Sequence, residues 1–113
     1  MQELNEIELT LLDGLTKKYP SLKSHIPHLK VTERQATGVG MYVNFSYSNF
    51  NEKLENLNSL FSNEENIEIP NLKYGLGYVI DISDGEIKYI EFITYGEENW
   101  NGKFNGYRIV KSK

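Results

Sequence analysis

The residues with the clearest potential for chemistry are Glu91 and the tyrosines near it. Glu91 lies in a largely apolar stretch, residues 74–100, with the sequence YGLGYVIDISDGEIKYIEFITYGEENW. Because an unpaired ionised carboxylate is too costly to bury, Glu91 must hydrogen-bond a tyrosine hydroxyl or an arginine, or line a cleft. In a cleft it could act as a general acid or base, with Tyr78 or Tyr95 tuning it and Arg34 pairing with a substrate anion.

Two interpretations of Glu91 stay open at this point. It belongs either to a structural hydrogen-bond network or to a binding or catalytic cleft, since perturbed carboxylates occur in both settings. The chain supplies no obvious nucleophile or oxyanion hole. We therefore do not expect an enzyme, and a small enzyme or ligand-binding protein with a cleft around Glu91 is the alternative.

The loop that follows Glu91 favours binding to another protein. Residues 94–100 read TYGEENW, in which aromatic side chains are surrounded by acidic ones. An exposed aromatic anchor within a charged rim suits an interface with a basic partner. The candidate partner-binding residues are Glu91, Tyr95, Glu97, Glu98 and Trp100. The alternative is that Tyr95 and Trp100 only close one end of the core.

Three other motifs do not predict a cofactor or metal site. The glycines of residues 37–40 enter a strand with no Lys-Ser or helix start after them, so they indicate a turn and not a phosphate cradle. The carboxylates of residues 81–86 resemble part of a calcium loop but lack its later glutamate. His25 and His28 flank Pro27 without the spacing of helical metal ligands. We expect no cofactor and no bound metal.

Composition is typical of a small acidic globular protein. With 113 residues, 39% of them hydrophobic, and no cysteine, the chain fits one domain spanning 1–113 and has no disulfide or thiolate chemistry. Its net charge of −4 argues against nucleic acid as a partner. No apolar run approaches the roughly 20 residues of a membrane span, and the first residues lack signal-peptide features. We therefore expect a cytoplasmic protein that does not bind membranes.

The dipeptide Asp84-Gly85 predicts a tight hairpin turn, because β-branched and aromatic residues flank it on both sides. Uninterrupted alternation from that turn places Tyr78 opposite Glu91 on one apolar face. On the other face Gly77 lies opposite Phe92. Only the turn end of this second face is polar, so we expect both faces of the hairpin to be covered, as in central strands.

Hydrophobic spacing predicts the remaining elements. They are an amphipathic helix over about 3–18, a short helix from Ser21 that ends before Pro27, strands over about 30–36 and 39–47 with a turn at Thr37-Gly38, and a last strand over 107–111. Residues 48–66 could hold one helix with Leu54, Leu57, Leu60 and Phe61 inward, or be partly mobile. The fold class we expect is α+β, an antiparallel sheet of about five strands with N-terminal helices packed on one face.

The combined motifs resemble a family of small, largely uncharacterised bacterial proteins. The shared features are Thr37-Gly38-Val39-Gly40, then Ile69-Pro70 with Leu72, Gly75 and Gly77, then Asp84-Gly85, and finally Glu91 through Tyr95-Gly96-Glu97 to Trp100. The resemblance covers roughly residues 29–100. The Asn-rich segment 48–66 is where we expect members of the family to differ.

The resemblance implies no enzymatic activity or cofactor. Small acidic bacterial proteins of this class are often immunity proteins, which neutralise a toxin domain, including toxins of contact-dependent systems. We therefore expect a basic toxin domain as the partner. Neutralisation would work by occlusion of the toxin's active site, with acidic residues that speed the encounter.

Overall fold

The computed structural model describes residues 2–63 and 65–111. Helix α1 (Glu6–Lys18) begins at a capping box, in which the side chains of Asn5 and Glu8 each accept a hydrogen bond from the other's backbone N–H. Lys17 and Lys18 in its last turn complement the helix dipole. The predicted first helix is confirmed, with its start at residue 6.

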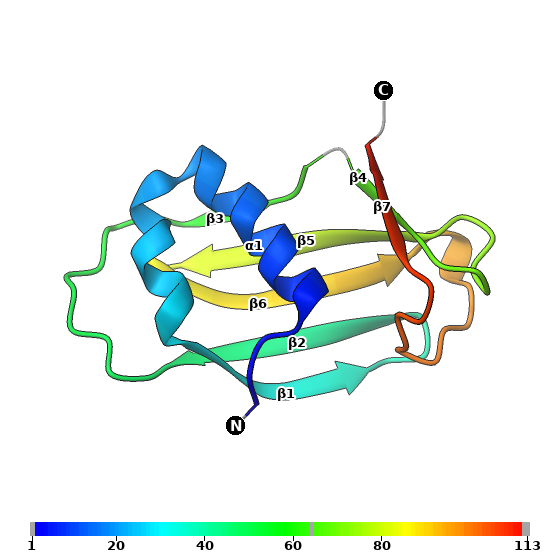
Figure 1. Cartoon of the computed structure of the whole chain (residues 1–113), viewed down its shortest axis with the longest axis horizontal. Coiled ribbons are helices and arrows are strands. Elements are labelled where there is room, and N and C mark those ends of the chain that lie inside the picture. Colours follow the sequence, from blue (N-terminus) through cyan, green and yellow to red (C-terminus); the bar gives the residue numbers. More distant parts are fainter. Residues whose placement is uncertain (1, 64, 112–113) are drawn as a thin grey trace.

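The second helical segment, η1 (Pro20–His28), is a 3-10 helix that packs beside α1. It runs through Pro27, where the sequence predicted that it would end. Figure 1 shows α1 and η1 together on one face of the sheet. The expected layer of N-terminal helices is confirmed.

One antiparallel sheet of seven strands forms the other layer. The strands are β1 (Leu29–Ala36), β2 (Gly40–Tyr47), β3 (Ser59–Phe61), β4 (Glu65–Glu68), β5 (Leu76–Ser83), β6 (Glu86–Thr94) and β7 (Arg108–Lys111). Their order is β1-β2-β6-β5-β4-β7, and β3 pairs with β5. The sheet is larger than the expected five strands because two short ones, β3 and β4, extend it beside β5.

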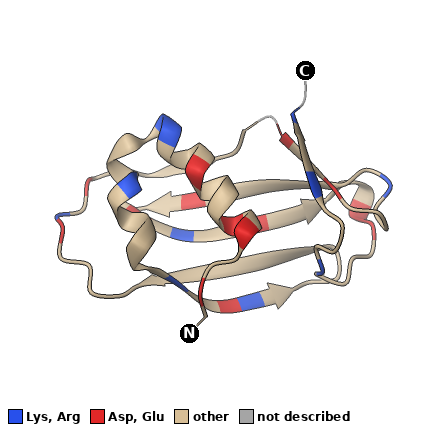
Figure 2. Ribbon diagram, viewed as in Figure 1, with Lys and Arg blue, Asp and Glu red and all other residues tan. Residues whose placement is uncertain are grey.

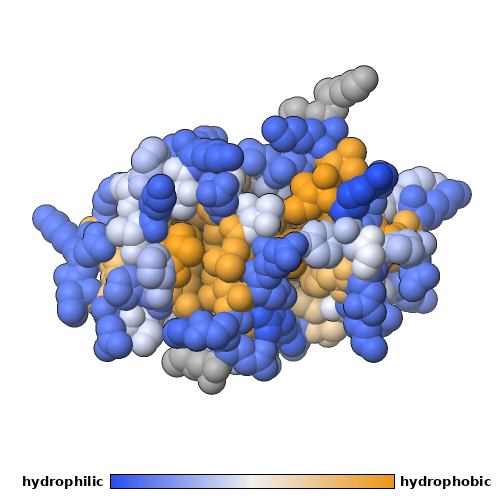
Figure 3. Space-filling view, viewed as in Figure 1, coloured by the Kyte–Doolittle hydropathy of each residue, from blue (hydrophilic) through white to orange (hydrophobic). Residues whose placement is uncertain are grey.

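The core lies between the helices and one face of the sheet. The part of that face beyond the helices is covered by the loop after β6, where the rings of Trp100 and Phe104 contact each other and Phe104 contacts Phe92. The hydroxyl of Tyr107 donates to Glu6 and joins this loop to α1. Figure 3 views this covered side, on which apolar side chains fill the spaces between the helices and the loop. No helix in the described residues has both the length and the apolar character to cross a bilayer.

The prediction of a helix within 48–66 is wrong for the described residues of that segment. They contain no helix, and their only regular structure is β3 and the start of β4. Leu54 and Leu60 are exposed, whereas Phe61 is buried. The segment instead covers the hairpin turn, since Leu57 accepts the backbone N–H of Gly85. Residue 64 lies outside the described residues.

The hairpin of β5 and β6 has the predicted turn but not the predicted register. Asp84 and Gly85 both have positive φ, and Ser83 pairs with Glu86 as expected. A β-bulge then leaves Lys88 without a partner, because Ile82 pairs with Ile87 while Asp81 already pairs with Tyr89.

The bulge moves every later residue of β6 to the face opposite the predicted one. Glu91 pairs with Val79 instead of Tyr78, and Gly77 lies opposite Ile93 instead of Phe92. Glu91 and Tyr78 therefore point to opposite faces of the sheet. The expectation that they share an apolar face is wrong.

Burial of apolar side chains explains why the bulge forms. Ile87, Ile90 and Phe92 are all buried, but a spacing of three residues between the first two cannot be met by strict alternation. One extra residue brings all three onto the core face. Each such side chain stabilises the fold by about 1.5–3 kcal/mol when buried. The predicted register would instead bury the carboxylate of Glu91, which is costly without a partner.

The bulge leads to a first prediction. Deletion of Lys88 should remove the bulge and leave all other pairs and faces unchanged, so the free energy of unfolding should fall by no more than about 1 kcal/mol. Deletion of Val79, in the regular part of β5, should reverse the faces on one side of the deletion and cost about 3 kcal/mol or more. Urea denaturation of both variants measures this. Equal losses would contradict the observed register.

A buried histidine fastens η1 to the sheet. His25 Nδ1 lies 2.8 Å from the hydroxyl of Tyr47, which also accepts the backbone N–H of Ile87 at 2.8 Å. Burial raises the pKa of Tyr47 to about 12, so its proton is available to donate to His25. The Tyr47 hydroxyl can donate to Nδ1 when His25 is neutral and carries its proton on Nε2. Burial also lowers the pKa of His25, against the opposing effect of Glu52 and other nearby carboxylates.

This chain of hydrogen bonds leads to a second prediction. Because the pKa of His25 is lower in the folded state than the ordinary 6.5, the unfolded state binds the proton more readily. The contribution of neutral His25 to the free energy of unfolding should be complete above about pH 6.5. It should be lost as the pH falls below that value toward the lower pKa of the folded state. His25→Gln should make the free energy of unfolding less dependent on pH between about 7.5 and about 5.5. An unchanged slope in urea denaturation series would exclude His25 as the source.

Candidate functional site

The face of the sheet opposite the helices is open, and it carries two rows of side chains across the central strands. Alternation places these residues outward, because their chain neighbours, such as Val43, Ile90 and Ile80, are buried in the core. The first row, in order of pairing, is Gln35, Tyr42, Glu91 and Val79, and the second is Glu33, Asn44, Tyr89, Asp81 and Leu60. We call this surface the open face.

The middle of the open face combines tyrosine rings with carboxylates. The rings of Tyr42 and Tyr89 meet edge to face, with centroids 5.6 Å apart. A hydrogen bond with the Glu91 carboxylate raises the pKa of the Tyr42 hydroxyl. Burial raises the pKa of Tyr89, and the nearby charges of Asp81 and Glu91 raise it further. Asp81 lies on β5 and Glu91 on β6, and Figure 2 shows that both of these central strands carry acidic residues.

No lysine or arginine neutralises these two carboxylates within residues 2–63 and 65–111. Asp81 accepts a hydrogen bond from the hydroxyl of Ser83, and Glu91 interacts with Tyr42. The nearby Lys88 forms its ion pair with Glu86. The open face is therefore negatively charged at its centre.

Apolar side chains continue the open face toward both ends. Leu60 is 66% exposed and Ile93 is 43% exposed. Tyr95 lies over Gly77, where an added Cβ would come within 2.6 Å of the tyrosine oxygen. The glycine thus lets the tyrosine ring rest on the strand. Ile93 and Tyr95 join the tyrosine and carboxylate cluster into one continuous surface.

The residues expected to form an acid/base cleft lie apart. Tyr78 is on the core face, where burial raises its pKa and its hydroxyl donates to Glu65 at 3.0 Å. A tyrosine does pair with a carboxylate on each face, but the pairs are Tyr78 with Glu65 and Tyr42 with Glu91.

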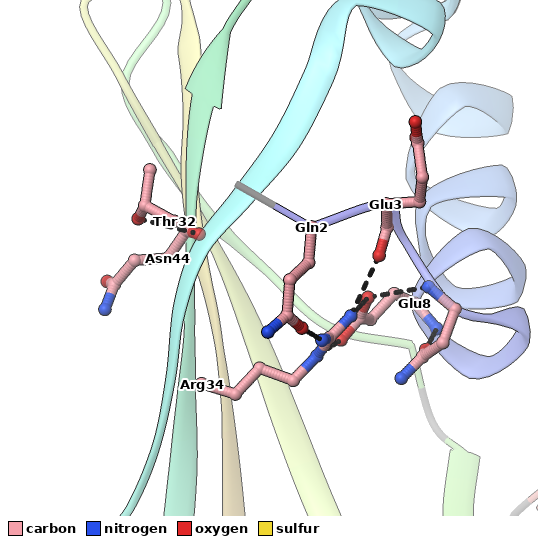
Figure 4. A network of polar contacts seen from close by, with 7 residues as sticks. Gln2, Glu3, Glu8, Thr32, Arg34 and Asn44 are labelled. Carbon is pink, nitrogen blue, oxygen red and sulfur yellow. Dashed lines mark hydrogen bonds and ion pairs between the residues drawn. The ribbon is translucent and has the colours of Figure 1, made fainter.

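Arg34 is held by α1 and is not directed at Glu91. Its guanidinium binds both carboxylate oxygens of Glu8, at 2.8 and 2.9 Å, and also donates to Gln2 and to the backbone of Glu3 (Figure 4). Glu8 is 1% exposed, so this pair satisfies a buried charge. Arg34 therefore has a structural role at the junction of α1 and β1.

The loop after β6 presents only part of its predicted anchor. Trp100 is 7% exposed and donates its indole N–H to the backbone oxygen of Lys103, so it closes the core and is not an exposed anchor. Glu98 binds the backbone N–H groups of Lys73 and Tyr74. Tyr95 and Glu97 are exposed.

Two hollows lie at the loop end of the molecule, away from Glu91. One, of about 470 Å³, is bordered by Leu72, Trp100 and Lys103. The other, of about 670 Å³, is bordered by Tyr74 and Arg108. Glu91 lines neither of them. Within the described residues, no group of three or more His, Asp or Glu side chains is placed to hold a metal ion.

Sequence reasoning missed Tyr42, Tyr89 and Asp81 as members of the site. Tyr42 alternates with the buried Met41 and Val43, which was a usable signal for an outward side chain. Uninterrupted alternation from the turn puts Tyr89 on the same face as Glu91 but on the core side, and the bulge reverses this for both residues. The signal for the bulge was the three-residue spacing between Ile87 and Ile90.

Comparison with known proteins gives no match: no protein-family model, no curated protein and no solved structure resembles the chain significantly. The resemblance to a family of small bacterial proteins stays a prediction.

The site leads to a third prediction. Glu91→Gln should lower the pKa of Tyr42 toward 10, because it removes the negative charge that opposes formation of tyrosinate. The free energy of unfolding should change by less than about 0.5 kcal/mol, since Glu91 is on the open face. Ultraviolet titration of the tyrosines, with Glu97→Gln as the matched control, measures the first effect. A large loss of stability would instead place Glu91 in a structural network.

Proposed function

We propose that the chain is a binding protein whose open face docks on a basic protein domain. The observation that carries this proposal is the continuous surface of tyrosines, apolar side chains and unneutralised carboxylates on the central strands. Tyrosine is enriched among the few residues that carry most of the binding energy of a protein interface, and complementary charge speeds association. We further propose that the partner is a toxin domain and that the chain acts as its immunity protein.

The size of the open face suits such a complex. The molecule measures 42 × 33 × 20 Å, and Figure 1 views it down the shortest axis, so the sheet faces extend along the two longer dimensions. A standard interface covers about 800 Å² on each partner. The open face is therefore large enough to cover the active site of a small domain.

Charge selects among the classes of partner. A second copy of the chain would oppose like charges, because the chain carries −4 overall and the centre of the open face is acidic. Nucleic acid and anionic membranes are repelled for the same reason. A domain with a basic active-site rim is the partner whose charge fits.

The loop after β6 adds to the edge of this proposed interface. Tyr95 lies on the open face over Gly77, and Glu97 is exposed next to it. Glu98 contributes by holding the segment at Lys73 and Tyr74. Trp100 supports the loop from the core side.

The immunity role leads to a fourth prediction. The gene beside this one should encode the C-terminal toxin domain of a large secreted protein, and the two products should co-purify. Asp81→Lys with Glu91→Lys should slow association with that domain about tenfold or more at low salt, because both charges lie at the centre of the open face. Stopped-flow measurement of the association rate tests this.

The matched control reverses two charges on the other side of the molecule. Asp13→Lys with Glu3→Lys changes the net charge by the same amount, and both residues are solvent-exposed in or before α1. Equal slowing by both double variants would exclude the open face as the docking surface. A neighbouring gene of another kind, with no binding to the toxin domain, would contradict the immunity role.

A further inference from the structure

We propose that Tyr42, Tyr89 and Glu91 form a binding site for one arginine side chain of the partner. The inference rests on the proposed docking of a basic protein on the open face, and it names the group that the face recognises. The three residues lie together because Tyr42 pairs directly with Glu91, and Tyr89 is two residues earlier on the same strand and face.

The carboxylate has acceptor positions left for a ligand. A carboxylate offers about four lone-pair sites, and Tyr42, which lies directly across from Glu91, has a single O–H and can occupy only one of them. Asp81 lies directly opposite Tyr89 and adds a second negative charge at the edge of the site. None of the lysines and arginines in the described part of the chain forms an ion pair with either carboxylate.

The tyrosine rings favour a flat cation. Tyr42 and Tyr89 meet at an interplanar angle of 70°, so one ring face and one ring edge are presented side by side. A guanidinium group stacks on aromatic faces and is more weakly hydrated than an ammonium group. It can also donate two parallel hydrogen bonds to one carboxylate, as Arg34 does to Glu8 within this chain. Arginine therefore fits this site better than lysine.

The backbone beneath the site is held in place before binding. β6 is bonded on both sides, to β2 and to β5, and the core residues under the site, Val43, Ile90 and Phe92, are fully buried. Little conformational entropy is lost when a ligand meets a preformed surface. The site is thus suited to act as the anchor point of the larger interface.

The test uses the arginine side chain alone. N-acetyl-arginine methylamide is titrated into the whole protein while backbone amide shifts are followed by two-dimensional NMR, with the neutral citrulline analogue as the matched ligand. We expect saturable shifts at residues 42, 89 and 91 with a dissociation constant on the order of millimolar. The citrulline analogue, and the corresponding lysine analogue titrated in the same way, should bind at least several-fold more weakly.

Two variants and one control locate the binding. Glu91→Gln should weaken binding roughly tenfold or more, and Tyr89→Leu should weaken it several-fold. Asp13→Asn, on α1, should leave it unchanged, and the dispersion of the amide spectra confirms that each variant is folded. Equal binding of the arginine and citrulline analogues, saturable shifts elsewhere, or no shift at these residues would overturn the arginine site.

The outcomes separate this inference from the proposed function. If the toxin domain binds and depends on Asp81 and Glu91 while the arginine analogue does not bind, the arginine site is wrong and the docking proposal stands. If the arginine analogue binds at Tyr42, Tyr89 and Glu91 while the toxin domain does not bind, the arginine site stands and the immunity role is wrong.

Discussion

The position of the whole candidate site depends on the β-bulge at Lys88. Upstream of it, Ile87 faces the core, and downstream of it Ile90 and Phe92 do so as well, although their spacing does not fit one alternating strand. The bulge resolves this conflict by adding one unpaired residue. Its consequence is that Tyr89, Glu91 and Ile93 face solvent on the open face.

The two faces of the sheet are used for different purposes. On the covered face, polar groups are paired within the chain: Glu8 with Arg34, and Tyr78 with Glu65. These pairs, together with the hydrogen bonds that link His25, Tyr47 and Ile87, hold the helices and the connecting segments to the sheet. On the open face, Asp81 and Glu91 have serine and tyrosine neighbours and form no ion pair within the described residues. That contrast is the physical basis for assigning binding to the open face.

Much of the fold could be predicted from local patterns. The capped helix α1, the alternation of β2 and the positive-φ turn at Asp84-Gly85 follow from short-range preferences that tertiary contacts reinforce. Residues 48–66 could not be predicted in this way. Their leucines have helical spacing, but Leu54 is exposed, and Leu60 of β3, which pairs with Asp81, lies on the open face away from the core. The short strands β3 and β4 form only because β5 offers an edge to pair with.

By itself, the sequence determined an acidic α+β chain with N-terminal helices, a hairpin at residues 84 and 85, and a carboxylate that needs a tyrosine or arginine partner or a position in a cleft. Only the tertiary structure decided on which face Glu91 lies and that its neighbour there is Tyr42. The reason is that a single extra residue in a strand reverses every later side chain. Local preferences do not determine on which face the residues after Lys88 lie. The simultaneous burial of Ile87, Ile90 and Phe92 against the helices and the loop does.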